Sequence, residues 1–485
     1  MAGMTDDLLS SPEAGATAVR GGALRVVSFA GGSLFSILGA ALLFRHLGVV
    51  DSGRYTTALS LGAVVTGFTD LGLTAIGMRE MATLEGERRA RMARNLLGIR
   101  LAVTVIGVVL VTAFAFAAYD TVLGFGVLIA GVGVLVANVQ STLSVPLMAQ
   151  LRLGWVSILD LVRQLAGVLM IVLLVLVGAK LLPFLAMPAI AAAIVLVPTA
   201  LLVRGDIPLR PSFEFAYWRE IAAPVFTYSI AVAAGTLYIR AAIVIVSLMA
   251  SEQQLGYFSI SFRVVEVLLL IPALLVGAAF PIFARAARDD PERLGYALGR
   301  VFDVALIAGV GLTLALAIGA PLAIEVMGGS DFEPAAPILA IQSVVLTATF
   351  VHTVWSYGML SLHLHRTILA LNVTALVVLV AVVSPLVAID GARGAAIGVA
   401  VVEVGAAIAG GILLVRGRRH LRPRLAVVWK VALAAALAAA PALLLADVPV
   451  AAAVALSLGV YGGVLLVLRA FPQELDALLR RRGGG

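Results

Sequence analysis

Apolar residues run through the chain in blocks of about 20, separated by shorter connections that hold most of the arginines. A helix of about 20 residues, rising 1.5 Å per residue, crosses the roughly 30 Å hydrocarbon layer of a bilayer. The pattern predicts about fourteen spanning helices. We expect them at 23–44, 55–76, 95–117, 121–143, 154–178, 181–203, 220–248, 255–280, 301–325, 334–361, 366–388, 394–415, 425–446 and 449–468.

Positive charge alternates from one connection to the next. Most of the 34 lysines and arginines fall in one alternate set of termini and connections, which includes Arg88, Arg288 and Arg418. The other set, which includes the acidic connection around Asp331 and Glu333, holds few. Because Lys and Arg collect on the cytoplasmic side of membrane proteins, we expect a multi-pass protein of the cytoplasmic (inner) membrane with both termini cytoplasmic.

The composition supports the same class of protein. Hydrophobic residues make up 62% of the chain and charged residues 13%, against roughly 25% charged residues in a soluble domain. The fold class is therefore predicted to be an all-α integral membrane protein. The formal net charge of +7 is explained by the arginine-rich side, so we expect contact with membrane lipids and no nucleic acid.

A turn motif occurs twice, at Gly53-Arg54-Tyr55 and at Gly256-Tyr257-Phe258, each time after an acidic turn. The copies are separated by an even number of predicted spans, so they have the same orientation and indicate two parallel repeats. We therefore predict two lobes of about six helices each and two further C-terminal helices. The expected parts are an N-terminal tail (1–22), a first lobe (23–203), a linker (204–219), a second lobe (220–415), the two further helices (425–468) and a C-terminal tail (469–485).

Motifs of enzymes and of metal or nucleotide sites are missing from the sequence. Cysteine is absent, which excludes disulfides and thiolate sites. The only lysines are Lys180 and Lys430, and neither lies in a phosphate-binding Gly-Lys-Ser/Thr loop. The histidines lack zinc-binding spacing. We expect no cofactor, no metal and no enzymatic activity, since the outer connections are too short for a catalytic domain.

Charged side chains inside predicted spans are the candidates for function, because a charge at the bilayer centre must face protein or water. They are Asp160, Arg163, Arg240, Arg263, Glu266 and Glu403. Two interpretations stay open: neutral pairs that hold helices together, or a cationic cavity that binds phosphate through arginine. Arg240 is the strongest candidate because it has no acid one turn away on its own helix. Asp70 and Asp303 lie near the arginine-rich ends and are expected to pair with arginines of the connections.

Three stretches resemble a known family. They are Phe44-Arg45-His46-Leu47-Gly48 through Gly53-Arg54-Tyr55 to Thr69-Asp70-Leu71-Gly72-Leu73, then Leu237-Tyr238-Ile239-Arg240 through Gly256-Tyr257-Phe258 and Arg263-Val264-Val265-Glu266 to Phe280-Pro281, and Gly391-Ala392-Arg393-Gly394-Ala395-Ala396. The chain resembles the oligosaccharide (O-antigen/polysaccharide) flippases of the multidrug/oligosaccharidyl-lipid/polysaccharide exporter superfamily. It departs from them after Arg240, where Ala241 and Ala242 stand in place of a frequent acid.

The resemblance implies a flippase that moves a polyprenyl-pyrophosphate-linked oligosaccharide across the membrane by alternating access. The lipid-linked oligosaccharide would be the main partner, with polysaccharide polymerase or glycosyltransferases as neighbouring proteins. Arg240, Arg263 and Arg163 would bind the substrate, while Glu266, Glu403 and Asp160 would couple an ion or pair with the arginines. An ion-coupled multidrug-type exporter is the alternative. A membrane polymerase or glycosyltransferase is a third, disfavoured by the short outer loops.

Overall fold

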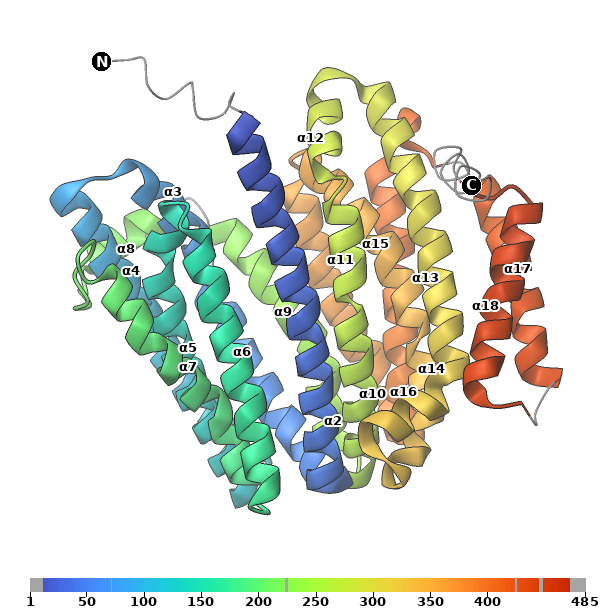
Figure 1. Ribbon diagram of the computed structural model, residues 1–485, viewed down its shortest axis with the longest axis horizontal. Helices are drawn as coiled ribbons and strands as arrows, with labels where there is room; N and C mark the ends of the chain where they lie inside the picture. The colour runs from blue at the N-terminus through green and yellow to red at the C-terminus, as the bar shows by residue number, and fades with distance from the viewer. Residues whose placement is uncertain (1–11, 71, 223–225, 424, 445–447, 472–485) are drawn as a thin grey trace. The chain divides into compact units, whose positions relative to one another are not determined.

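Every regular element is a helix within residues 12–70, 72–222, 226–423, 425–444 and 448–471, the ranges that the computed structural model describes (Figure 1). The helices before residue 223 are α2 (Pro12–Asp70), α3 (Leu73–Thr83), α4 (Gly86–Ala118), α5 (Thr121–Ala149), α6 (Leu153–Leu176), α7 (Leu181–Val203) and α8 (Phe215–Ala222). Those after it are α9 (Phe226–Met249), α10 (Glu252–Leu268), α11 (Leu270–Gly277), α12 (Phe280–Asp289), α13 (Pro291–Gly328), η2 (Ser330–Ala335), α14 (Ala336–Gln342), α15 (Val344–Ser361), α16 (His365–Val415), η3 (Arg419–Leu421), α17 (Ala426–Leu444) and α18 (Val450–Val467). The predicted all-α class is confirmed.

The helices account for the predicted spans. Ten segments of the described chain are long and apolar enough to cross a membrane. Two of these, Ile37–Thr83 and His365–Val415, each cover two predicted spans. The shorter apolar helices Ala233–Met249 and Ala426–Ala440 supply two more. The set matches the predicted number of about fourteen spans.

A glycine lies at the junction of the two predicted spans in each of the long helices α2 and α16. Within α2 the backbone of Gly48 leaves helical geometry, with φ of 71° and ψ of −176°. Within α16 the same happens at Asp390 and Gly391, where φ of Gly391 is 52°. Positive φ is readily adopted by glycine alone, so each glycine permits a sharp reversal between two spans without a connecting loop.

Helices also extend beyond the predicted spans at the arginine-rich end. The connection between the predicted spans 55–76 and 95–117 is helical over most of its length, with a break between α3 and α4 around Leu84. The N-terminal tail predicted for 1–22 becomes helical at Pro12, and residues 1–11 and 472–485 lie outside the described ranges. A helix can continue from the membrane into water without a break, because its backbone hydrogen bonds are formed within the helix in both surroundings.

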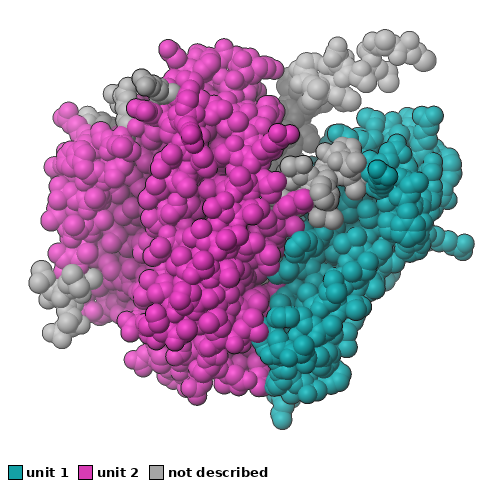
Figure 2. All heavy atoms as spheres, turned by 180° about the vertical axis from the view of Figure 1, so that it is seen from behind, with its two compact units in different colours: residues 1–46, 61–229 teal, residues 47–60, 230–485 magenta. Residues whose placement is uncertain are grey.

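The chain divides into two compact units (Figure 2). Unit 1 holds residues 1–46 and 61–229, and unit 2 holds residues 47–60 and 230–485. The short segment 47–60 therefore packs with unit 2, although the chain on both sides of it belongs to unit 1. The lobe boundaries expected from the sequence stay a prediction.

Each unit has its own apolar core. In unit 1 the core is built by α3, α4, α5 and α7, with Leu96 and Leu147 fully buried in it. Unit 2 has one core around Phe302 and Trp355, whose rings stack at 5.1 Å, and a second around Phe258 that joins α9, α10 and α16. The second core includes Ala241 and Val265, the immediate neighbours of Arg240 and Glu266.

Candidate functional site

Helix α9 carries two polar side chains that face different neighbours. Tyr238 and Arg240 are two residues apart, so they project about 200° apart around the helix. The hydroxyl of Tyr238 donates to Oε1 of Glu403 on α16 over 2.8 Å. Nη2 of Arg240 donates to Oε1 of Glu266 on α10 over 2.5 Å. Two of the three acids expected inside the membrane, Glu266 and Glu403, are therefore bound to α9.

Glu266 is shared by two arginines. Its Oε2 accepts from Nη1 of Arg263, one turn earlier on α10, over 2.8 Å, while its Oε1 is bound by Arg240. Within the Arg240–Glu266–Arg263 cluster two arginines therefore share one carboxylate, so the three side chains together carry one net positive charge.

The cluster is accessible as well as charged. The side chains of Arg240 and Glu266 are each 22% exposed, and that of Arg263 is 33% exposed. The Arg240 guanidinium also lies 5.6 Å from the ring centre of Phe262, in cation–π geometry. An arginine held by one carboxylate oxygen and one ring keeps donors for a further anion, because a guanidinium has five N–H groups.

The remaining predicted site residues form a separate pair in unit 1. On α6, Nη2 of Arg163 donates to Oδ1 of Asp160 over 3.2 Å. Both side chains are about half exposed. This pair is neutral and local to one helix, so it adds no net charge. Among the described residues, no group of His, Asp or Glu is arranged to hold a metal ion.

The two copies of the glycine turn motif pack against each other in unit 2. A Cβ on Gly53 would lie 3.0 Å from the backbone nitrogen of Gly256, and one on Gly256 would lie 2.1 Å from the carbonyl oxygen of Val49. Arg54 donates to Oε1 of Glu252 beside this contact, over 2.7 Å. The sequence showed the motif twice without showing that its copies touch.

The third stretch that resembles the family, residues 391–396, contacts the second of these turns. The backbone N–H of Ala392 donates to Oε1 of Gln254 over 2.8 Å. Gly391 has positive φ, and a Cβ there would collide with Gln254. The glycines in these turns are thus explained by close approach of backbone to backbone and of backbone to side chain. We refer to residues 48–54, 252–256 and 390–392 as the turn junction.

Residues 42–337 match the family of polysaccharide biosynthesis proteins. The chain belongs to this family.

Solved structures show the fold of this family member to be that of membrane transporters. It is similar to the lipid II flippase MurJ in an inward closed conformation, with a TM-score of 0.75, 12% identity and coverage of 92% of this chain and 98% of that chain. An inward-facing multidrug resistance MATE transporter of the MOP superfamily gives a TM-score of 0.61 at 14% identity, covering 80% and 94%. A MOP superfamily transporter from Pyrococcus furiosus gives 0.55 at 15% identity, covering 82% and 94%. A comparison with curated proteins finds no match.

This polysaccharide biosynthesis protein also has a buried polar network in unit 1 that the sequence did not reveal. Arg100 on α4 is 3% exposed and donates to Asp70 at the end of α2, to Thr74 on α3 over 2.9 Å and to Thr142 on α5 over 3.3 Å. Asn138 on α5 extends the network. Asp70 pairs with an arginine as expected, but this arginine is buried within α4, inside the predicted span 95–117, and does not belong to a connection. The network ties together the helices on both sides of the break at Gly72, where φ is 69°.

The linker before α9 is fixed to α4 by one glutamate. Glu214 accepts from Arg91 over 2.5 Å and from Asn95 over 2.8 Å. The hydrogen bonds from Arg91 and Asn95 lower the pKa of Glu214 to about 2. Trp218 donates to Asn95 as well, over 3.1 Å, so α8 is held by the same residues. The linker is thus an ordered part of unit 1 and not a loose tether.

Proposed function

We propose that this protein flips a polyprenyl-pyrophosphate-linked oligosaccharide from the inner to the outer leaflet of the cytoplasmic membrane. The observation that carries the proposal is the Arg240–Glu266–Arg263 cluster, in which two arginines share one carboxylate between the shorter apolar helix Ala233–Met249 and the spanning segment Glu252–Asp289. Arg240, which is held by one carboxylate oxygen, keeps guanidinium donors that a further anion can accept from. Membership of a polysaccharide biosynthesis family favours an anion that is attached to a glycan.

In this proposal the pyrophosphate binds to the two arginines. Guanidinium groups match phosphate oxygens through two parallel N–H donors each. Glu266 orients both arginines and offsets part of their charge. The pyrophosphate would be attracted by the two arginines but would compete with this carboxylate for them. The competition would lower its affinity enough for it to be released.

Alternating access requires one side to close while the other opens. The turn junction supplies a closure that has both steric and ionic parts, Gly53 against Gly256 and Arg54 with Glu252. It lies on the side that carries few arginines, which the charge alternation places outside the cell. We propose that the turn junction closes the outer side and separates when the sugar is released there.

Ion coupling is assigned to Glu403 and Glu266 in this proposal, because each lies inside a spanning segment. Asp160 would remain bound to Arg163 and take no part. Glycosyltransferases would supply the lipid-linked substrate, and a polymerase would consume the flipped product. The protein itself would make and break no covalent bond.

Flipping by purified protein in liposomes tests the proposal. The substrate is a short polyprenyl-pyrophosphate sugar, and its exposure is followed with an enzyme that reaches only one leaflet. We expect Arg240→Ala to lose at least about tenfold in rate, because a charge-assisted hydrogen bond of about 1.5–3 kcal/mol is removed. Arg240→Lys should stay slow, since the ammonium lacks the planar fork.

Loss of flipping in Arg240→Ala can be distinguished from misfolding. Arg240→Ala leaves Glu266 paired with Arg263 one turn away, so the acid keeps a partner. Arg288→Ala removes an exposed arginine that is paired with its neighbour Asp289, and it should flip at the wild-type rate. Normal flipping by a well-folded Arg240→Ala would end the case for the cluster as the receptor. Ion-driven efflux of small cations with no flipping would favour the multidrug-type exporter instead.

A further inference from the structure

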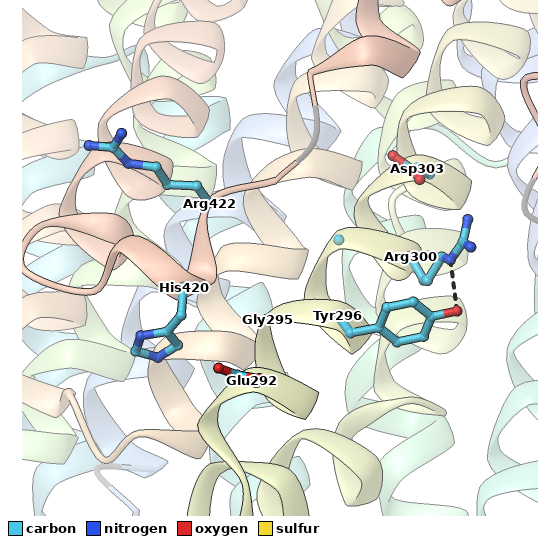
Figure 3. Close-up of a pocket in the computed structure, with 8 residues that line it drawn as sticks. Glu292, Gly295, Tyr296, Arg300, Asp303, His420 and Arg422 are labelled. Atoms are coloured by element: carbon cyan, nitrogen blue, oxygen red, sulfur yellow. Dashed lines mark hydrogen bonds between the residues drawn. The ribbon is translucent and has the colours of Figure 1, made fainter.

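A hollow of about 240 Å³ lies along the first turns of α13, away from the Arg240–Glu266–Arg263 cluster in sequence (Figure 3). One wall is the face of α13 that carries Glu292, Tyr296, Arg300 and Asp303. The other wall is the segment around η3, between α16 and α17. The hollow is smaller than the roughly 300–1,000 Å³ of pockets that enclose a whole small molecule. Its size fits a headgroup.

Two glycines on α13 create the hollow. Gly295 lets the η3 backbone approach, because a Cβ there would lie 2.2 Å from the carbonyl oxygen of His420. Gly299, one turn on, has nothing within 4 Å of the position of a Cβ. The first glycine brings the facing segment in, and the second leaves space beneath it.

The facing segment is anchored and presents polar groups. Leu421 is 1% exposed and belongs to the core of unit 2. His420 and Arg422, on either side of it, are exposed and line the hollow. Figure 3 shows these two residues across the hollow from Tyr296 and Arg300. The anchored leucine therefore fixes the place of its two polar neighbours.

The charges around the hollow balance. Arg300 and Arg422 are opposed by Glu292 and Asp303, and His420 adds a titratable ring. Nε of Arg300 donates to the hydroxyl of Tyr296 over 3.2 Å, and its guanidinium lies 5.2 Å from that ring. A hollow lined by both signs suits a zwitterion better than an anion, since an anion would also meet the carboxylates.

On α13, Glu292 and Arg300 follow the order of the amine and the phosphate in a phospholipid headgroup, and Asp303 adds a second acid one turn beyond Arg300. Glu292 lies near the start of the helix, and Arg300 lies about 12 Å further along, toward the apolar part. In a membrane-bound phospholipid the amine lies outermost and the phosphate lies closer to the acyl chains. Tyr296 is 55% exposed between them, as expected for a tyrosine at the headgroup level.

We infer that this hollow binds the phosphoethanolamine headgroup of a membrane phospholipid at the arginine-rich end of the protein. Arg300 and Arg422 bind the phosphate through charge-assisted hydrogen bonds. The ammonium donates to Glu292. A choline headgroup fails in this role because its three methyl groups replace the N–H donors and add bulk. The site is independent of the flipped substrate.

The test is lipid retention by the purified full chain, measured by native mass spectrometry after delipidation. Phosphatidylethanolamine, phosphatidylcholine and phosphatidylglycerol with identical acyl chains are added in turn. We expect phosphatidylethanolamine to bind about tenfold more tightly than phosphatidylcholine, as the loss of a charge-assisted hydrogen bond implies. Free phosphoethanolamine should displace it and free phosphocholine should not, which separates headgroup recognition from chain adhesion.

Two kinds of variant locate the site. Gly299→Leu fills the hollow without changing charge and has open space for its Cβ, so it should abolish the preference at an unchanged melting temperature. Glu292→Gln and Arg300→Gln should each weaken the preference for phosphatidylethanolamine. Arg288→Gln, at an exposed position, should leave this preference unchanged. Equal retention of the three lipids, a preference for phosphatidylglycerol, or full retention by a folded Gly299→Leu would overturn the inference.

Discussion

Gly53 and Gly256 lie so close that neither has room for a side chain, because a methyl group on either would meet the backbone of the other's segment. They occupy equivalent positions in the two copies of the turn motif, and Arg54 and Glu252 form an ion pair beside them. Glycine at both positions is thus a packing requirement of the turn junction. This relationship gives the first prediction.

Gly256→Val should force the turn junction apart, because the carbonyl oxygen of Val49 lies 2.1 Å from the new Cβ. We expect the protein to insert normally but to favour the outward-open state. The natural chain has no cysteine, so single cysteines near Tyr257 report opening through their labelling by a water-soluble reagent. Gly459→Ala, in open space on α18, is the matched control. Unchanged labelling in Gly256→Val would show that the turn junction is no gate.

Glu403→Gln should separate ion coupling from binding. The amide keeps the shape of the side chain and can still accept from the hydroxyl of Tyr238, which now lies 2.8 Å from the carboxylate. It can neither carry charge nor exchange a proton. We expect flipping to lose its response to an imposed proton or cation gradient while substrate binding persists. The measurement compares flipping rates with and without the gradient, and an intact response would remove Glu403 from the coupling step.

Asp70→Ala should destabilise the protein more than Arg100→Met does. Without Asp70 the buried guanidinium of Arg100 loses its counter-charge, which costs about 3–5 kcal/mol for a fully buried pair and less here because Asp70 is 37% exposed. Methionine in place of the arginine leaves no buried charge behind. Melting temperatures of the two variants give the order. Glu80→Ala breaks the exposed pair with Arg79 and should have little effect.

The docking of the linker on α4 should depend on pH through Glu214. A folded-state pKa of about 2, below the ordinary 4.5, means that ionised Glu214 favours docking above about pH 4.5, and that this contribution is lost as the pH falls toward 2. We expect a cysteine introduced at Ser212 to become accessible over this range. Glu214→Gln should show raised accessibility already at neutral pH. Equal accessibility of the two proteins at every pH would contradict a role for this glutamate in docking.

The sequence by itself determined the class of protein and the number of spans. Apolar blocks of bilayer length allow one structure, a helix whose backbone groups are all paired internally, so neither packing nor partners were needed to predict it. The alternation of arginines similarly predicts orientation from local composition alone. The intramembrane charges could also be found from the sequence, because each is costly enough to demand a reason.

Only the tertiary structure decided which charges meet. Arg240 and Glu266 are 26 positions apart, and Tyr238 and Glu403 are 165 apart, so helix packing and not spacing brings them together. The same holds for Gly53 with Gly256 and for Arg100 with Asp70. Periodicity within a helix tells which face a residue is on, whereas the identity of the helix opposite that face depends on how all the apolar surfaces pack at once. The partner of each charge, and therefore what it can bind, depends on which helix lies opposite it.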